Sequence, residues 1–164
     1  MKKAWVVSII SICIFVLFSF IQKSSKNIPV PYPEGYRSWT HVKSSFLGPQ
    51  NPLYKFRGGF IHIYANQKAL NGLQTGNFTD GSILVFDVIK EINNNGDLSE
   101  GERRLVDVMV KDSISYNDTG GWGFEEFNGD SKTDRVILQN STEKCFNCHS
   151  RQKQTGYVFS KYRP

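Results

Sequence analysis

The hydrophobic pattern of the chain starts with one long apolar run and continues as a series of short apolar segments. Residues 4–21 are apolar apart from a few small polar positions, and Lys2, Lys3 and Lys23 flank the run. A short basic start followed by an apolar run is typical of a bacterial export signal. The run of about 18 residues is also close to the minimum that spans a bilayer, and no small-x-small cleavage site follows it. Residues 1–26 are therefore expected to be a signal peptide or an N-terminal membrane anchor, and the missing cleavage site favours an uncleaved apolar helix.

Four later segments combine β-branched and aromatic residues, which is typical of strands. Turn-forming residues lie between these segments, as in residues 79–81 and 93–97. The strands are predicted over residues 60–64, 82–89, 105–111 and 122–127.

The chain between the apolar run and the first strand is rich in proline. Residues 27–35 contain three prolines and predict a linker. Apolar positions then recur at helical spacing from Tyr36 through Trp39 and Val42, so a helix is predicted there.

Two further helices are predicted. Asn66 can cap a short helix over residues 67–73. The second covers residues 141–153, with Ser141 or Thr142 as its N-cap. Strands in succession with helices at both ends indicate an α+β domain with a mainly antiparallel sheet. Its length suits one domain with one sizeable core.

Most of the net positive charge of the chain lies in its leader. The chain has 20 basic and 15 acidic residues, a formal net charge of +5. Four of those basic residues (Lys2, Lys3, Lys23 and Lys26) precede residue 27, which leaves sixteen basic against fifteen acidic residues. A domain this close to neutral gives no reason to expect a nucleic-acid partner.

The clearest functional motif of the chain is Cys-x-x-Cys-His at residues 145–149, which contains Cys145, Cys148 and His149. This spacing is typical of c-type haem attachment. Two thiols about one helical turn apart can form thioethers with the haem vinyl groups, and the adjacent imidazole can bind the iron. One motif predicts one covalent haem c, with His149 as the metal ligand.

Other uses of two cysteines fit this sequence less well. A structural zinc site needs four ligands, and the only other cysteine is Cys13 in the apolar run. A thioredoxin-like pair would follow a strand early in a βαβ unit, whereas this pair lies near the end of the chain. Export also favours haem, because haem c is attached outside the cytoplasm.

Three other side chains of the domain are candidates for the second side of the iron. His62 alternates with Phe60 on a predicted strand, so it is either a distal hydrogen-bond donor or a histidine whose hydrogen bonds are satisfied within the fold. Met109 has the pattern of a core residue, and His41 that of a surface or packing residue.

Residues 91–102 resemble an EF-hand loop, although Glu91 stands where that loop begins with Asp. No pair of flanking helices is predicted. A polar loop between two strands is therefore preferred to a calcium site.

The domain also resembles the cytochrome P-460 family, which includes the cytochromes c′-beta. The resemblance covers residues 36–164 as a haem domain, and it implies a haem packed against an antiparallel sheet, His149 as proximal ligand and often a homodimer. The matching segments are residues 32–44, 58–66, 75–88, 108–112, 120–131 and 145–149.

The resemblance offers two functions. Members that oxidise hydroxylamine carry a lysine, cross-linked to the haem, just before a TG-x-F-x-DG segment. Here Gly72, Leu73 and Gln74 hold those positions, and the nearest lysine is Lys68. A cytochrome that binds NO or CO, or transfers electrons, is therefore preferred to a hydroxylamine oxidoreductase. Candidates for the distal pocket are Phe60, His62, Phe78, Phe86 and Phe124, and ordinary core packing is the preferred alternative for each phenylalanine. Glu125 or Glu126 is a candidate proton-transfer group, with acids on the strand surface as the alternative.

The leader and the resemblance together predict location and partners. The domain is expected in the periplasm, tethered to the inner membrane through residues 4–21 or, after cleavage, soluble. Its expected partners are a small gaseous or nitrogenous ligand and a periplasmic redox protein.

Overall fold

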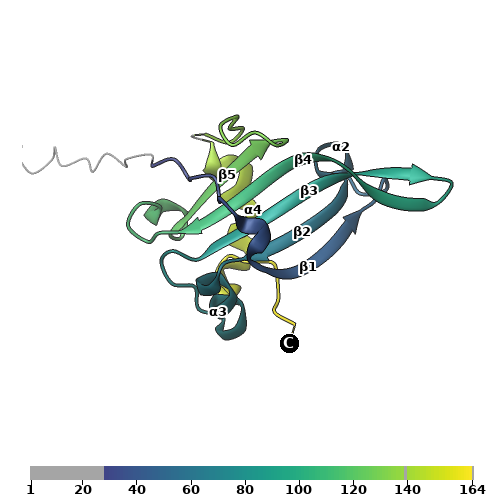
Figure 1. The fold of residues 1–164 in the computed structure, drawn as a ribbon. Coiled ribbons are helices and arrows are strands. Elements are labelled where there is room, and N and C mark those ends of the chain that lie inside the picture. Colours follow the sequence, from purple (N-terminus) through teal and green to yellow (C-terminus); the bar gives the residue numbers. More distant parts are fainter. Residues whose placement is uncertain (1–27, 139, 164) are drawn as a thin grey trace, which may run out of the picture.

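A five-stranded antiparallel sheet forms the centre of the fold in the computed structural model, which describes residues 28–138 and 140–163. Each strand pairs with the next one in the chain, so the sheet order is β1-β2-β3-β4-β5 (Figure 1). The strands are β1 (Thr40–Leu47), β2 (Gly59–Ala65), β3 (Ile83–Asn94), β4 (Asp97–Lys111) and β5 (Trp122–Asn128). The helical segments are η1 (Tyr36–Ser38), α2 (Tyr54–Arg57), α3 (Gln67–Thr75), η2 (Asn117–Thr119), η3 (Thr142–Phe146), α4 (Asn147–His149) and η4 (Ser150–Thr155).

The predicted antiparallel sheet is confirmed, but the helix predicted from Tyr36 is wrong. Only Tyr36–Ser38 is helical, and residues from Thr40 onward form strand β1. Backbone pairing with β2, from Thr40 opposite Ala65 to Leu47 opposite Gly59, outweighs the helical spacing of a few apolar side chains.

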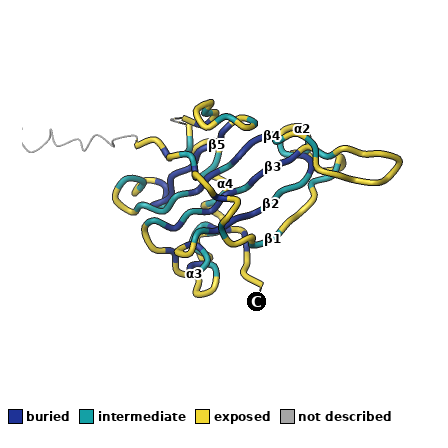
Figure 2. The backbone as a smooth tube through the Cα atoms, viewed as in Figure 1, coloured by how far each residue is buried: buried dark blue, intermediate teal, exposed yellow. Residues whose placement is uncertain are grey.

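The hairpin between β3 and β4 extends beyond the rest of the sheet, and its far end is exposed (Figure 2). Asn95 and Gly96 make its two-residue turn with φ of 56° and 101°, values that suit the twist of a hairpin. The amide N–H of Gly96 donates to the Asn93 side chain, and Glu102 pairs with Lys90. Residues 91–102 thus form the predicted polar hairpin, not an EF-hand loop.

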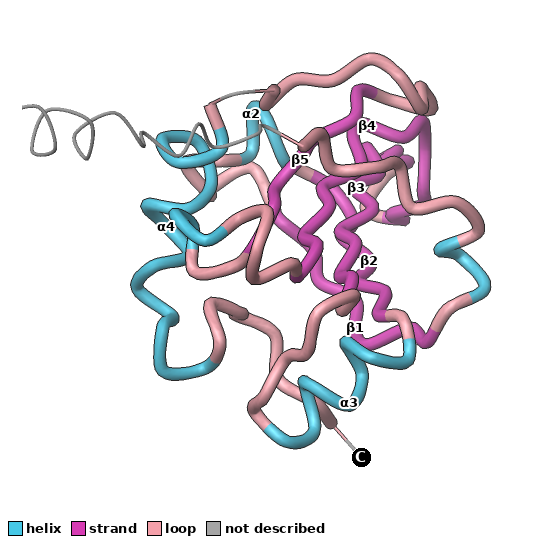
Figure 3. Tube along the Cα trace, turned by 90° about the vertical axis from the view of Figure 1, so that its left-hand side faces the viewer, coloured by secondary structure: helices cyan, strands magenta, loops and turns pink. Residues whose placement is uncertain are grey.

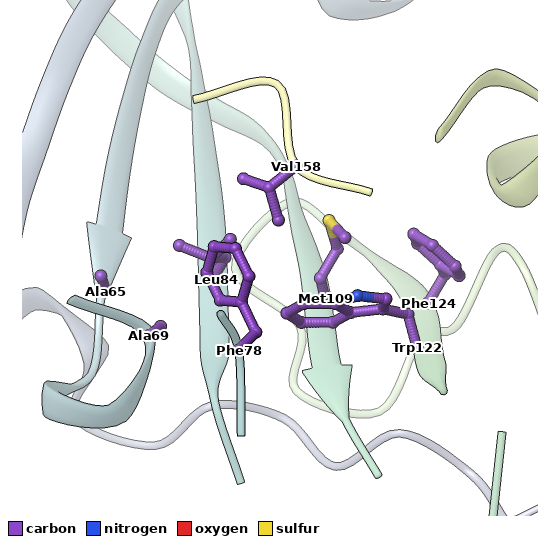
Figure 4. Packing of buried hydrophobic residues seen from close by; sticks show 8 residues of the cluster. All are labelled: Ala65, Ala69, Phe78, Leu84, Met109, Trp122, Phe124 and Val158. Carbon is purple, nitrogen blue, oxygen red and sulfur yellow. The ribbon is translucent and has the colours of Figure 1, made fainter. Parts of the chain in front are cut away.

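Two apolar clusters cover the two faces of the sheet, and helical segments lie on either side of it (Figure 3). On one face, called the motif face below, residues of the strands pack with Ala69 of α3 and Val158 of the C-terminal segment (Figure 4). The opposite face packs against Val30 and Tyr36. Val30 is only 3% exposed, so this residue of the predicted linker belongs to the core, while Ile28, Pro29, Pro31, Glu34 and Gly35 are exposed.

Helix α3 begins as predicted. The Asn66 side chain accepts a hydrogen bond from the Ala69 amide, which satisfies one free N–H of the first turn. Gly76 ends the helix in the left-handed conformation that favours glycine.

Within residues 28–138 and 140–163, no helix is long and apolar enough to cross a membrane. The predicted signal peptide or anchor, residues 1–26, lies outside the described residues.

Candidate haem-binding site

The Cys-x-x-Cys-His motif lies in a helical segment on the motif face. The segment runs through η3, a π-helical turn, then α4 and the 3₁₀ turns of η4. The helix predicted over residues 141–153 is therefore confirmed, but its predicted cap is not. Ser141 already has helical backbone angles and its side chain makes no capping hydrogen bond.

The two thiols of the motif are not joined in a disulfide, and they differ in exposure. Cys145 is half-buried and packs against the apolar cluster of the motif face, whereas Cys148 is exposed. Burial raises the pKa of the Cys145 thiol to about 11. One thiol of the motif thus lies inside the domain and the other at its surface.

The ring of His149 is held by the chain that follows it. Its Nδ1 atom lies 2.8 Å from the carbonyl oxygen of Tyr157. Because a carbonyl oxygen only accepts, Nδ1 carries the proton, and the lone pair of Nε2 is left to bind a metal. Gly156 and Tyr157, with φ of 66° and 68°, reverse the chain and bring this carbonyl back to the ring.

Aromatic rings enclose the imidazole of His149. Its centroid lies 5.0 Å from that of Phe124 and 5.0 Å from that of Phe159. Burial lowers its pKa, while the hydrogen bond to Tyr157 partly opposes the shift. The neutral imidazole, which is the form that binds iron, is therefore favoured.

A polar cluster shares the motif face with the haem motif. Arg57 of α2 donates to Asp107 of β4 and to Glu126 of β5, with 2.7 Å between its Nη2 atom and a Glu126 carboxylate oxygen. Burial raises the pKa of Cys145 and lowers that of His149, and the positive charge of Arg57 weakens the first shift and adds to the second.

Sequence reasoning singled out only one member of this cluster, Glu126. Asp107 lies directly opposite Glu126 in the register of β4 and β5, so strand alternation would have placed the two carboxylates together. Arg57 comes from a short helix that the sequence did not predict.

The predicted distal residues divide between the two faces of the sheet. Phe78 and Phe124 belong to the cluster of the motif face, and strand alternation puts Phe86 on that face, opposite Asp107. Phe60 and His62 alternate with residues of the motif face and lie on the opposite side, where their rings stack on each other. The structure does not bring these two together with the haem motif.

Glu125 also points away from the motif face. It is 4% exposed, and its carboxylate accepts from Arg135 and from the amides of Ile137 and Leu138. This glutamate fixes the chain after β5. Both predictions for Glu125 are therefore wrong, because it is neither an acid on the surface nor a proton-transfer group beside the motif.

Lys68 does not approach the motif. Its ammonium group donates to the carbonyl oxygen of Asp80 at 2.9 Å, and its side chain runs past Gly81 at the surface. The inward side of α3 instead carries Ala69, Leu70 and Leu73.

A cavity of about 560 Å³ opens beside β5, and Phe124, Ser141 and Thr142 bring its lining up to the segment that carries the motif. Val30, Tyr116, Glu125 and Arg135 are among its lining residues. Neither cysteine of the motif nor His149 lines it, so we assign the haem site from side-chain chemistry rather than from this cavity.

The residues present fit a haem. Two free thiols, one of them against apolar side chains, stand beside an imidazole whose Nε2 is free. Among the described residues, no group of three or more His, Cys, Asp and Glu side chains is arranged to hold a bare metal ion.

An antiparallel sheet with this motif on one face defines a cytochrome-type haem protein. The family model for cytochrome P460 matches residues 33–160, and the chain belongs to the cytochrome P460 family. Membership implies a haem cofactor with its iron. No curated protein matches the chain.

Proposed function

We propose that the protein is an exported cytochrome with one covalent haem c that binds a small gas such as NO or CO beside an open iron position. One observation carries this proposal. Of the described side chains, only His149 presents a free imidazole nitrogen on the motif face, because His41 and His62 lie on the other face.

Met109 is not expected to be a second ligand of the haem iron. It is 5% exposed and packs inside the apolar cluster of the motif face, with its sulfur beside Val158 (Figure 4). Its buried thioether therefore acts as a core side chain.

Arg57 gives the site a polar component that the resemblance did not lead us to expect. Its guanidinium is oriented by Asp107 and Glu126, so part of its hydrogen-bonding capacity is used on the protein. The remaining N–H groups can donate to a polarised ligand such as NO. The haem environment is therefore mixed and not wholly apolar.

The same cluster favours a second candidate function, the oxidation of hydroxylamine. Bound haem supplies a redox-active iron, and such a reaction also needs groups that accept protons. Asp107 and Glu126 are carboxylates able to accept them. The position of Lys68, held on Asp80 and exposed, disfavours this candidate relative to gas binding.

The leader pattern supports export to the periplasm, with the domain tethered through residues 4–21 or released by cleavage. Electron exchange with a periplasmic redox protein and assembly into a homodimer are part of the same proposal. The support for both is the family to which the chain belongs.

Gas binding is tested by titrating the reduced, haem-loaded protein with CO and NO while recording visible spectra. We expect one ligand per haem. In Arg57→Leu the NO dissociation rate should rise about tenfold, since a hydrogen bond from a charged group contributes roughly 1.5–3 kcal/mol. CO should be affected less, because it is less polarised.

Lys55→Ala is the matched control, an exposed position of the same helix α2, and it should leave both rates unchanged. A reduced protein that binds neither gas would contradict the proposal. Steady turnover of hydroxylamine in a parallel assay would instead establish the second candidate.

A further inference from the structure

The two histidines outside the haem motif meet on the opposite face of the sheet. The chain has three histidines, and two of them, His41 of β1 and His62 of β2, approach the same hydroxyl group. The Oγ atom of Ser44 lies 3.0 Å from Nε2 of His41 and 2.7 Å from Nδ1 of His62. Two residues 21 positions apart in the sequence thus present imidazole nitrogens to one point.

The orientation of the His62 ring is fixed by a carboxylate. Its Nε2 atom lies 2.7 Å from a carboxylate oxygen of Glu100, which accepts the proton of that nitrogen. The Nδ1 atom is then the nitrogen with the lone pair, and it faces Ser44. An imidazole that donates one nitrogen to a carboxylate and offers the other is the usual arrangement of a metal-binding histidine.

Aromatic neighbours support both rings. The His62 ring is parallel to that of Phe60, with an interplanar angle of 3° and centroids 6.5 Å apart. The His41 ring meets Tyr64 edge to face at 5.6 Å. His41 and Ser44 are exposed, so a solvated ion can reach the point where the two nitrogens converge.

We propose that His41 and His62 form a binding site for a borderline divalent cation, Zn²⁺ or Cu²⁺. Imidazole nitrogen is a preferred ligand of both ions. The ion takes the place between the two rings, and the Ser44 hydroxyl and water complete its coordination. Glu100 is not a ligand here, because it acts through the other nitrogen of His62 and adds negative charge nearby.

The test is equilibrium dialysis of the haem-loaded full-length protein against Zn²⁺ and, separately, Cu²⁺. Haem loading keeps the motif cysteines and His149 occupied. We expect saturable binding of one ion per chain. His41→Ala and His62→Ala should each weaken it at least tenfold, and Glu100→Gln, which removes the orienting charge, by about 10–100-fold. Ser45→Ala, an exposed neighbour on the same strand, should have no effect.

The mode of binding has its own readout. In the CO complex, nitrogen–proton correlation spectra of the histidine rings should show Zn²⁺ shifting Nδ1 of His62 and Nε2 of His41. Absence of saturable binding would overturn the proposal. Binding that survives in both histidine variants would do so as well, since the ion would then lie elsewhere.

Discussion

Phe124 and His149 are in direct contact across the motif face, with ring centroids 5.0 Å apart. Phe124 belongs to the edge strand β5, and His149 to the short helix α4. The contact seats the C-terminal helical segment on the sheet, and the Tyr157 carbonyl fixes the rotation of the imidazole. The position of His149, the proposed iron ligand, is thus set by packing between distant parts of the chain.

We predict that the haem is covalently attached through both thiols of the motif. Denatured protein should retain haem on a gel stained for peroxidase activity, because thioethers survive denaturation. Cys145→Ala and Cys148→Ala should each weaken attachment. Cys13→Ala, outside the motif, should not. Extraction of the haem into acid butanone from the unmodified protein would contradict covalent attachment.

We predict that the apolar leader stays on the mature protein as a membrane anchor. Residues 4–21 are long enough to span a thin bilayer, and no cleavage signal follows them. The intact mass of the protein isolated from membranes should include the leader. An intact mass that corresponds to a chain starting at residue 22 or later would show that the leader is cleaved and that the protein is soluble in the periplasm.

We predict that the haem-free domain loses stability in alkaline solution through Cys145. Burial raises the pKa of this thiol from its ordinary 9.0 to about 11, so the folded state favours the neutral form. The stability that this gives is complete below pH 9 and is lost as the pH rises through 11. Urea unfolding between these values should show a steeper loss for the unmodified domain than for Cys145→Ala. Cys148→Ala, which keeps the buried thiol, should follow the unmodified domain.

The sheet could be largely predicted from sequence because its strands carry a local signal. Residues 60–64 and 122–127 have β-branched and aromatic residues in strand patterns, and β2 and β5 cover them. Strand β1 was missed because only pairing with β2 distinguishes it from a helix with a few well-spaced apolar residues. That pairing is a long-range interaction that local pattern does not record.

The site was predictable to the extent that it is contiguous in sequence. Cys145, Cys148 and His149 form one motif, and its spacing alone predicts haem attachment. Arg57 joins the motif face through α2, a helix of only four residues with no sequence signal. The face on which His62 lies depends on register, and a shift of one residue would reverse it.

We predict that Asp87 is a principal stabilising residue of the opposite face. Its side chain is fully buried, and it accepts hydrogen bonds from Arg103 at 2.7 Å and from Arg37 at 2.9 Å. Asp87→Ala should lower the free energy of unfolding by about 3 kcal/mol, because the guanidinium of Arg103 loses its buried carboxylate partner and keeps only the exposed carboxylate of Asp130. Thermal or urea unfolding measures the loss.

The matched control for Asp87 is Glu102, whose side chain is 83% exposed in its pair with Lys90. Glu102→Ala should change the free energy of unfolding by no more than about 0.5 kcal/mol. Equal losses in the two variants would show that burial of the Asp87 carboxylate has no special effect on stability.

Our last prediction is that no lysine is cross-linked to the haem. A lysine can attack the ring only if its amine is held at the haem edge, and Lys68 instead donates to the Asp80 carbonyl at the surface. The adjacent side of α3 offers Leu70 and Leu73, which have no nucleophile. The reduced protein should therefore show the spectrum of an ordinary c-type haem, and Lys68→Ala should leave that spectrum unchanged. Mass spectrometry of the haem peptide provides the decisive measurement. A fragment that joins Lys68 to the motif peptide, together with a red-shifted spectrum lost in Lys68→Ala, would overturn this prediction. It would also favour hydroxylamine oxidation over gas binding, because family members that oxidise hydroxylamine carry such a cross-link. The sequence just before Thr75 has no lysine to form it.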